Sequence, residues 1–432
     1  MIRSILVASR GEIAVRIIRT CQEMGIRTVA IYTPADADAL HVQLADKAVA
    51  IESSTGGDAY GDGAAILAVA GESGVDAIHP GAGVLAQDAG FARQVAEAKM
   101  AWIGAGAETL ERIAAPEALR AALVTVDVVA AGDPSPNENG DFRRVIFQVF
   151  GDSQGNTIHL GERECSIHRG QRVLVAETPS PALHSELRAR MGRAAVAAAK
   201  AAGLVGAGSV TFLLDGESGF VFAGIQSGLA VEHPVTELVA GLDLVRWQIR
   251  VADGGQLPLR QEQVQPRGHA IGCHICAEDP ANGFASAPGT ILRLAEPTGP
   301  GIRVDSGLQS GDVLRDGDDS LIAKVSVYAE NRAAAVNRMD RALRSFVALG
   351  DLTTNTAFLR DVIAHPVFQA GETTTNFVSE HFSDWQPFGA SGPDAELIAT
   401  ALAEFRTQQA ARHSPGGEDA RSALQRLLEF RL

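Results

Sequence analysis

Lysines and glycine runs, which commonly build phosphate-binding sites, are scarce in this sequence. The chain of 432 residues has only four lysines, Lys47, Lys99, Lys200 and Lys324, and none lies between Lys99 and Lys200. It also has no glycine run long enough to wrap a triphosphate. Because phosphate groups are bound by backbone N–H groups and by point cations, the sequence offers a nucleotide few contacts.

The cysteines predict neither a metal centre nor a disulfide framework. Cys273 and Cys276 have C-x-x-C spacing, but they lie in a strand-like run. Side chains three residues apart on a strand point to opposite faces, which is poor geometry for one metal ion. Together with Cys21 and Cys165 they make four cysteines in a long chain, which is too few for a disulfide scaffold.

The overall composition is that of a globular protein with an acidic surface. Net charge is −15, the pI is about 5.2 and 46% of residues are hydrophobic. This balance disfavours nucleic acid or an anionic membrane as a partner. There is no run of about eighteen apolar residues and no signal-peptide pattern at the start. We therefore expect a cytoplasmic protein.

Residues 1–130 are predicted to form an α/β domain with a doubly wound parallel sheet, because short β-branched runs alternate with helical patterns. The expected strands are Ser4–Ala8, Arg27–Tyr32, Val75–His79 and Ala101–Gly104. The expected helices are Gly11–Met24, Gly63–Ala70 and Ala107–Ala122. Residues 131–141 contain a cluster of turn formers and are predicted to be a linker.

Residues 142–384 are predicted to form an α+β domain on antiparallel sheet. The expected strands are Arg144–Phe150, Thr157–Glu164, Val173–Thr178, Ser209–Leu214, Gly219–Ala223, Gly268–Ala277 and Leu321–Tyr328. Helices are expected over Ser185–Ala202, Val235–Ala252 and residues 332–365. Residues 385–432 are predicted to be a helical tail.

Several collinear motifs resemble biotin carboxylase, the ATP-grasp component of acyl-CoA, acetyl-CoA and pyruvate carboxylases. They include Ala8-Ser-Arg-Gly-Glu-Ile-Ala-Val-Arg, His79-Pro-Gly-Ala-Gly, Glu162-Arg-Glu-Cys-Ser, Val231-Glu-His-Pro-Val-Thr-Glu and Asp319-Ser-Leu-Ile-Ala-Lys. The resemblance covers roughly residues 1–380 and implies the biotin carboxylase fold. In that family ATP, magnesium and biotin take part in the carboxylation of biotin by bicarbonate.

The resemblance also implies a glycine-rich lid, which this sequence lacks. The lid should lie between the helix near residue 120 and the strand Arg144–Phe150, where only the linker stands. The lid would carry one phosphate lysine. The other should fall at Pro116, and proline offers neither a charge nor an N–H group.

Further family positions for metal and bicarbonate are substituted. Thr211 and Gly224 stand where the resemblance implies the two metal-binding glutamates, and Gln226 replaces an asparagine. Magnesium prefers hard anionic oxygens, which threonine and glycine do not supply. Residues expected to bind bicarbonate are also changed: Gly228 for an arginine, Ala230 for a glutamine and Val173 for a lysine.

Other family positions are retained. Glu232 matches the general base and Arg303 matches the arginine that faces the biotin ureido group. Val231, His168 and Gln226 are the further residues expected to line the cleft. Residues that match the family's two-fold dimer contact are Arg16, Arg19, Glu23, Tyr328 and Arg332. We expect an interface there.

The leading hypothesis is a catalytically degenerate homologue, a non-catalytic structural or regulatory partner of a biotin-dependent acyl-CoA carboxylase. No cofactor is expected. The expected partners are a second copy or an active biotin carboxylase paralogue, with carboxyltransferase or biotin carrier subunits as further candidates. One alternative is an enzyme with ATP-independent chemistry at Glu232 and Arg303. The other is an active, ATP-dependent biotin carboxylase subunit.

Overall fold

The computed structural model describes residues 1–53, 58–115, 141–215 and 219–387. The chain divides into two compact units, Met1–Ser383 and Asp384–Leu432. Pro116, the linker up to residue 140 and the tail from residue 388 lie outside the described residues. Among the residues described, no helix is long and apolar enough to cross a membrane.

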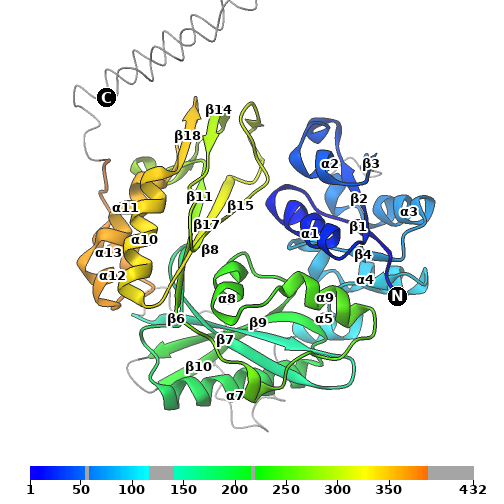
Figure 1. Cartoon of the computed structure of the whole chain (residues 1–432), viewed down its shortest axis with the longest axis horizontal. Coiled ribbons are helices and arrows are strands. Elements are labelled where there is room, and N and C mark those ends of the chain that lie inside the picture. Colours follow the sequence, from blue (N-terminus) through cyan, green and yellow to red (C-terminus); the bar gives the residue numbers. More distant parts are fainter. Residues whose placement is uncertain (54–57, 116–140, 216–218, 388–432) are drawn as a thin grey trace, which may run out of the picture. The chain divides into compact units, whose positions relative to one another are not determined.

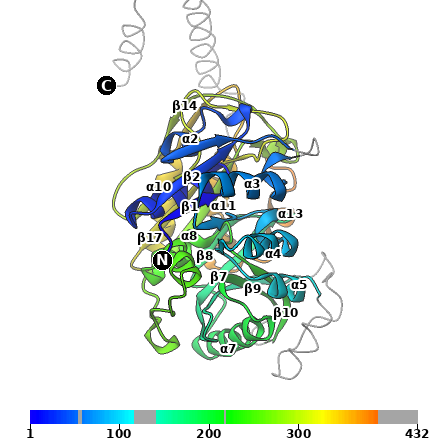
Figure 2. The ribbon, with the colours of Figure 1, turned by 90° about the vertical axis from the view of Figure 1, so that its right-hand side faces the viewer.

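The N-terminal region forms the predicted parallel sheet, in the order β3-β2-β1-β4-β5 (Figures 1 and 2). Its strands are β1 (Ser4–Val7), β2 (Arg27–Tyr32), β3 (Lys47–Ala50), β4 (Ala77–His79) and β5 (Ala101–Trp102). Its helices are α1 (Gly11–Glu23), α2 (Leu40–Leu44), α3 (Gly63–Ser73), α4 (Ala89–Glu97) and α5 (Ala107–Ile113). α1 forms because Ile13, Ile17 and Ile18 repeat at helical spacing, and they pack on β1.

The second sheet has eight strands in the order β10-β9-β6-β7-β8-β11-β17-β15, with antiparallel neighbours, as predicted. They are β6 (Arg143–Gly151), β7 (Thr157–Arg169), β8 (Arg172–Thr178), β9 (Gly206–Asp215), β10 (Gly219–Ser227), β11 (His269–Cys276), β15 (Ile302–Ser306) and β17 (Leu321–Ala329). One face carries α7 (Ser185–Ala202), which Figures 1 and 2 show along β6 and β9. α7 packs its alanine-rich face against Phe147 and Phe212.

The prediction of one helix over Val235–Ala252 is wrong. Two helices, α8 (His233–Ala240) and α9 (Leu244–Ala252), occupy this stretch. α8 ends at Gly241, whose φ of 65° is left-handed and suits glycine. α9 then begins with Asp243, whose carboxylate accepts the N–H of Arg246 as an N-cap.

The prediction of a helical segment over residues 332–365 is also wrong in part. α10 (Arg332–Ser345) and α11 (Thr356–Ala364) flank a strand, β18 (Val347–Gly350). β18 pairs with β14 (Gly289–Ala295), which also pairs with β16 (Val313–Leu314). Gly350 fits because a Cβ there would stand 1.8 Å from the Thr290 carbonyl oxygen. The short elements β12 (Glu278–Asp279), β13 (Ala285–Ser286), α12 (Pro366–Ala370) and α13 (Phe377–His381) complete this region.

Candidate functional site

Two positions where the resemblance predicted metal-binding glutamates face each other across neighbouring strands. Thr211 on β9 pairs directly with Gly224 on β10. Residues directly opposed on antiparallel strands bring their Cβ positions within about 5 Å, close enough to share a metal ion. A Cβ on Gly224 would meet nothing within 4 Å, so there is room for a side chain. The two positions together nevertheless offer one hydroxyl and no carboxylate, so they do not fit magnesium.

Cross-strand pairing links Thr211 through β6 to a buried arginine on β7. Thr211 pairs with Ile146 on β6, and Ile146 pairs with Arg163 on β7. Arg163 is fully buried and donates to neutral oxygens: Gln148 Oε1 at 2.9 Å, Thr236 Oγ1 at 2.9 Å and Ser209 Oγ at 3.1 Å. Within the described chain no carboxylate pairs with it. This guanidinium is enclosed by the protein and does not face a ligand.

Glu232 borders a cavity of about 280 Å³, which we call the smaller cavity. Glu232 is the residue that caps the start of α8, but its carboxylate makes no capping hydrogen bond. Among the described residues, this carboxylate makes no hydrogen bond or ion pair. The other lining residues are Gln171, Arg172, Val173, Val231, His274, Asp319 and Leu321.

Arg303 does not line this cavity, because it is bound to carboxylates of its own chain. Its Nη1 lies 2.7 Å from Glu237 Oε2 and its Nε lies 2.8 Å from Asp305 Oδ2. Burial disfavours its charged form, but Asp305 and Glu237 outweigh burial and raise the pKa of Arg303. The sequence predicted an arginine that faces a ligand, whereas this guanidinium already has two anionic partners.

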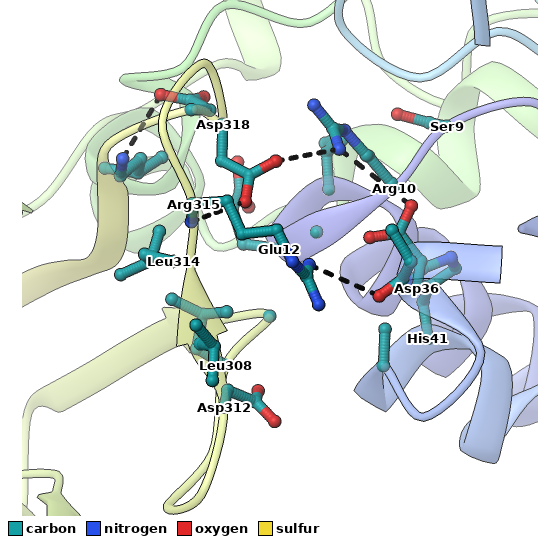
Figure 3. A pocket seen from close by; sticks show the side chains of 18 of the residues that line it. Ser9, Arg10, Glu12, Asp36, His41, Leu308, Asp312, Leu314, Arg315 and Asp318 are labelled. Carbon is teal, nitrogen blue, oxygen red and sulfur yellow. Dashed lines mark hydrogen bonds and ion pairs between the residues drawn. The ribbon is translucent and has the colours of Figure 1, made fainter. Parts of the chain in front are cut away.

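A larger cavity of about 470 Å³ lies between the N-terminal segment and the loop between β16 and β17, near residue 315 (Figure 3). Arg10 reaches toward Asp318, at 3.4 Å, and Asp36, at 3.9 Å, while Arg315 donates to the Ala35 carbonyl oxygen at 3.4 Å. Val231, Asp319 and Leu321 line both cavities, so the two adjoin. The sequence did not predict the larger cavity. Residues of two motifs that the sequence did single out, beginning at Ala8 and at Asp319, nevertheless line it.

A buried ion pair lies beside both cavities. Lys324 on β17 is 1% exposed, and its Nζ lies 2.8 Å from Oε2 of Glu12, which lines the larger cavity. In the sheet, Lys324 is opposite His274, which lines the smaller cavity. Burial raises the pKa of Glu12, although Lys324 acts in the opposite direction. This lysine is therefore already engaged by a carboxylate.

The structure brings only part of the predicted cleft together. Val231 and Glu232 line the smaller cavity, but His168 and Gln226 line neither cavity. His168 is half-buried on β7 with its Nδ1 3.0 Å from the Gly170 carbonyl oxygen, and Gln226 is exposed on β10. His274 was not predicted as a site residue, although it lines the cavity that Glu232 borders.

Two of the predicted dimer residues are half-buried arginines that make ion pairs within their own chain. Arg16 is 11% exposed, with its Nη2 3.0 Å from Glu237 Oε1 and 2.9 Å from Asp243 Oδ1. Arg332 binds Glu177 at 2.7 Å. Of the others, Arg19 and Glu23 are exposed, Glu23 pairs with Arg246 at 2.9 Å, and Tyr328 is half-buried. The interface remains a prediction.

The cysteines are all free and buried: Cys21, Cys165, Cys273 and Cys276. Cys273 and Cys276 lie on β11, as the strand-like pattern predicted. Over the described part of the chain, no three histidine, cysteine, aspartate or glutamate side chains are arranged to hold a metal ion.

Three protein-family models match the chain in order. The biotin carboxylase N-terminal domain matches residues 1–110, and the biotin carboxylase C-terminal domain matches residues 272–380. Between them, the ATP-binding domain of the carbamoyl-phosphate synthase L chain matches residues 140–260.

Proteins with similar sequences point to the same family. Biotin carboxylase 1 of Bacillus subtilis (strain 168) is 39% identical over 446 residues, covering 88% of this chain and 99% of that protein. Biotin carboxylase of a Nostoc species is 40% identical over 440 residues, covering 87% and 98%. The alpha subunit of mitochondrial methylcrotonoyl-CoA carboxylase from Glycine max is 35% identical over 492 residues, covering 96% and 67%.

Solved structures of the same kind superpose on the chain. The biotin carboxylase domain of a thermophilic 2-oxoglutarate carboxylase bound to ADP has a TM-score of 0.84 at 34% identity, covering 88% of this chain and 98% of that one. A complete multifunctional pyruvate carboxylase from Rhizobium etli has a TM-score of 0.85 at 33% identity, covering 89% of this chain and 41% of that one.

Proposed function

Because this chain belongs to the biotin carboxylase family, we propose that it is a member that has lost catalysis and serves as a non-catalytic partner of a biotin-dependent acyl-CoA carboxylase. The observation that carries the proposal is the direct pairing of Thr211 with Gly224. These positions correspond to the family's two metal-binding glutamates, and neither residue can ligate magnesium through a carboxylate.

The length of the chain supports the absence of a lid. The alignment with the Bacillus subtilis protein spans 446 positions but covers only 88% of 432 residues, which is about 380. The difference, about 66 positions, corresponds to residues of that relative with no counterpart here. The family models also leave residues 111–139 unmatched, where the lid should begin.

The charges around the cleft support the loss of phosphate and bicarbonate binding. Val173, Gly228 and Ala230 replace side chains that would contact bicarbonate. Arg303 is retained, but Glu237 and Asp305 hold its guanidinium. An anion at Arg303 would have to compete with two carboxylates that are already in place, so this retained arginine is poorly placed to activate it.

A role as a partner is consistent with the relatives. Methylcrotonoyl-CoA carboxylase alpha subunits and a multifunctional pyruvate carboxylase are among the proteins that the chain resembles. We propose that the chain pairs with itself or with an active paralogue, and that carboxyltransferase or biotin carrier subunits complete the assembly. We place it in the cytoplasm. Its four cysteines are free thiols, and a reducing compartment keeps thiols in that state.

Two measurements test this function. In the first, purified protein receives MgATP, bicarbonate and free biotin, with an active biotin carboxylase as the positive control. The proposal expects no bicarbonate-dependent ADP release and no calorimetric signal for MgATP. ADP release at a rate comparable to the control would instead identify an active enzyme. In the second, the tagged chain is purified from its native host. The partner role is wrong if neither a biotinylated protein nor a carboxyltransferase accompanies it.

The carboxylate of Glu232, which has no partner among the residues that the structure describes, favours one alternative: ATP-independent binding or chemistry in the remnant cleft. A thermal-shift screen with biotin, bicarbonate and small carboxylates distinguishes it from a purely structural role. A hit that disappears in both Glu232→Ala and Arg303→Ala would support altered chemistry in this cleft. The absence of any hit would count against it.

A further inference from the structure

We propose that the smaller cavity binds a small organic cation, namely a primary ammonium or guanidinium group on a short aliphatic chain. This inference rests on the proposed function, because it requires that the cavity no longer receives an anion. It concerns the cavity bordered by Glu232, His274, Arg172 and the apolar residues Val173, Val231 and Leu321.

The first argument is that the cavity presents hydrogen-bond acceptors. Glu232 is half-buried, and its carboxylate has no partner within the described residues. His274 is 4% exposed, and its Nδ1 lies 2.7 Å from the Val173 carbonyl oxygen. Since a carbonyl oxygen can only accept, Nδ1 carries the proton and Nε2 carries the lone pair.

His274 is neutral at pH 7, because burial lowers its pKa to about 4. Its Nε2 makes no hydrogen bond to the described part of the chain, so it remains available to a ligand in the cavity. Glu232 and Nε2 of His274 therefore supply two acceptors to one small space. A ligand with at least two N–H donors satisfies both.

The second argument is that the nearby cation is already neutralised. Arg172 is the basic residue of the cavity wall. Its Nη2 lies 3.0 Å from Asp319 Oδ1 and its Nη1 lies 3.8 Å from Glu278 Oε1. The same Nη1 also donates to Ser320 Oγ at 3.0 Å. With Arg172 matched by carboxylates, the unmatched charge on the cavity wall is the negative charge of Glu232.

This charge balance rejects anions. A bicarbonate or carboxylate in the cavity would lie beside Glu232 without a free cation, and such like-charge contacts are strongly unfavourable. A cation would instead gain a charge-assisted hydrogen bond in a partly enclosed site. The volume of about 280 Å³ and the walls formed by Val173, Val231 and Leu321 suit a short aliphatic chain.

The test is isothermal titration calorimetry on the full chain at pH 7 with methylguanidinium and ethylammonium chlorides. Both should bind with a dissociation constant of about 1 mM or tighter. Tetramethylammonium, which has no N–H, should bind at least about tenfold more weakly because it cannot donate to the acceptors. Sodium acetate and bicarbonate should give no signal.

Variants identify the site. Glu232→Gln keeps the shape but removes the charge and should weaken methylguanidinium binding by about tenfold or more. Glu372→Gln, at an exposed position outside both cavities, is the matched control and should leave binding unchanged. Val173→Lys places an ammonium group beside Glu232 and should abolish binding even if Glu232→Gln fails to fold.

Three results would overturn the inference: no cation binding up to about 50 mM, wild-type affinity in Glu232→Gln, or tighter binding of acetate than of methylguanidinium. A parallel titration with MgATP separates this inference from the proposed function. If neither ATP nor cation binds, only the inference fails. If ATP binds, the proposed loss of catalysis fails, whatever the cations do.

Discussion

Replacing Glu237 with glutamine should destabilise the chain by about 3 kcal/mol. The Glu237 side chain is 2% exposed and joins three elements. It accepts from Arg303 Nη1 on β15 at 2.7 Å, from Arg16 Nη2 on α1 at 3.0 Å and from the Leu244 N–H at 2.6 Å. Glutamine keeps the size of the side chain but withdraws the negative charge from between two guanidinium groups.

The magnitude follows from what remains around these guanidinium groups. Breaking a buried ion pair by removing one partner costs about 3–5 kcal/mol, because a buried charge is left uncompensated. Here Arg16 keeps Asp243 at 2.9 Å and Arg303 keeps Asp305 at 2.8 Å, so neither guanidinium is fully orphaned. The glutamine oxygen can also still accept one hydrogen bond. These two factors place the expected loss at the lower end of the range.

The assay is urea unfolding of the wild type and the variant at pH 7. The free energies of unfolding are compared with one shared dependence on urea concentration. Glu111→Gln is the matched control, because Glu111 also pairs with an arginine, Arg93, but is 54% exposed and lies outside the predicted interface. An exposed pair contributes about 0–1 kcal/mol, so this control should unfold close to the wild type. If Glu237→Gln costs less than about 1 kcal/mol, the network does not hold Arg303, and the account of the cleft charges is wrong.

Three further predictions concern packing, pH and the two positions where the family resemblance implies metal ligands. Gly307→Ala should lower the free energy of unfolding by about 2 kcal/mol or more, because the new Cβ would lie 2.4 Å from the backbone carbonyl carbon of Gly11. Gly224→Ala is the control and should be close to neutral in the same urea unfolding experiment, because a Cβ there meets nothing within 4 Å. Burial lowers the pKa of His79 to about 4. As the pH falls from about 6.5 to 4, His79 therefore takes up a proton in the unfolded chain but not in the folded one, and the free energy of unfolding decreases. Wild type should lose about 2 kcal/mol more than His79→Gln between pH 7.5 and pH 5 in urea unfolding, and equal losses would contradict this. The double variant Thr211→Glu, Gly224→Glu should fold but give no calorimetric signal for MgATP at about 1 mM, because the proposed function also requires that phosphate-binding cations are missing; a signal would show that the carboxylates alone were limiting.

The elements that were predicted correctly are those whose pattern is local and long. α7 matches its predicted bounds, Ser185–Ala202, because an alanine-rich run is bounded by a helix start and by Gly203, whose φ is 69°. β2 matches because Arg27–Tyr32 is a compact β-branched run between turns. In such segments local propensity and burial agree, so the sequence alone decides the structure.

The elements that were missed depend on distant partners. β18 has only four residues, Val347–Gly350, directly after a helix, and pairs with β14 more than fifty residues earlier. β3 (Lys47–Ala50) lies at the edge of its sheet and is not fully buried, so its hydrophobic pattern is weak. Short strands of this kind are stabilised by tertiary pairing rather than by propensity, and a local pattern does not reveal them.

The site was predictable in its residue types but not in its contacts. The family motifs identified Thr211, Gly224 and Glu232 as individual positions, and the sheet register then paired the first two. The partners of Arg303 could not be read from the sequence, since Glu237 lies 66 residues away and Arg16, which shares that carboxylate, lies 221 residues from it. Such contacts depend on how α1, α8 and β15 pack together.

Retention of an arginine is therefore not retention of a binding site. For an anion to take the place of Glu237 at Arg303 Nη1, the guanidinium would have to leave that carboxylate, which is 2% exposed. The vacated carboxylate would then keep only Arg16 and its backbone donor, at a cost comparable with the several kcal/mol of a broken buried pair. A small anion gains about 1.5–3 kcal/mol from a charge-assisted hydrogen bond, which does not offset that cost. By contrast, the carboxylate of Glu232 has no partner among the described residues, so a cation could bind it without breaking a contact seen in the structure.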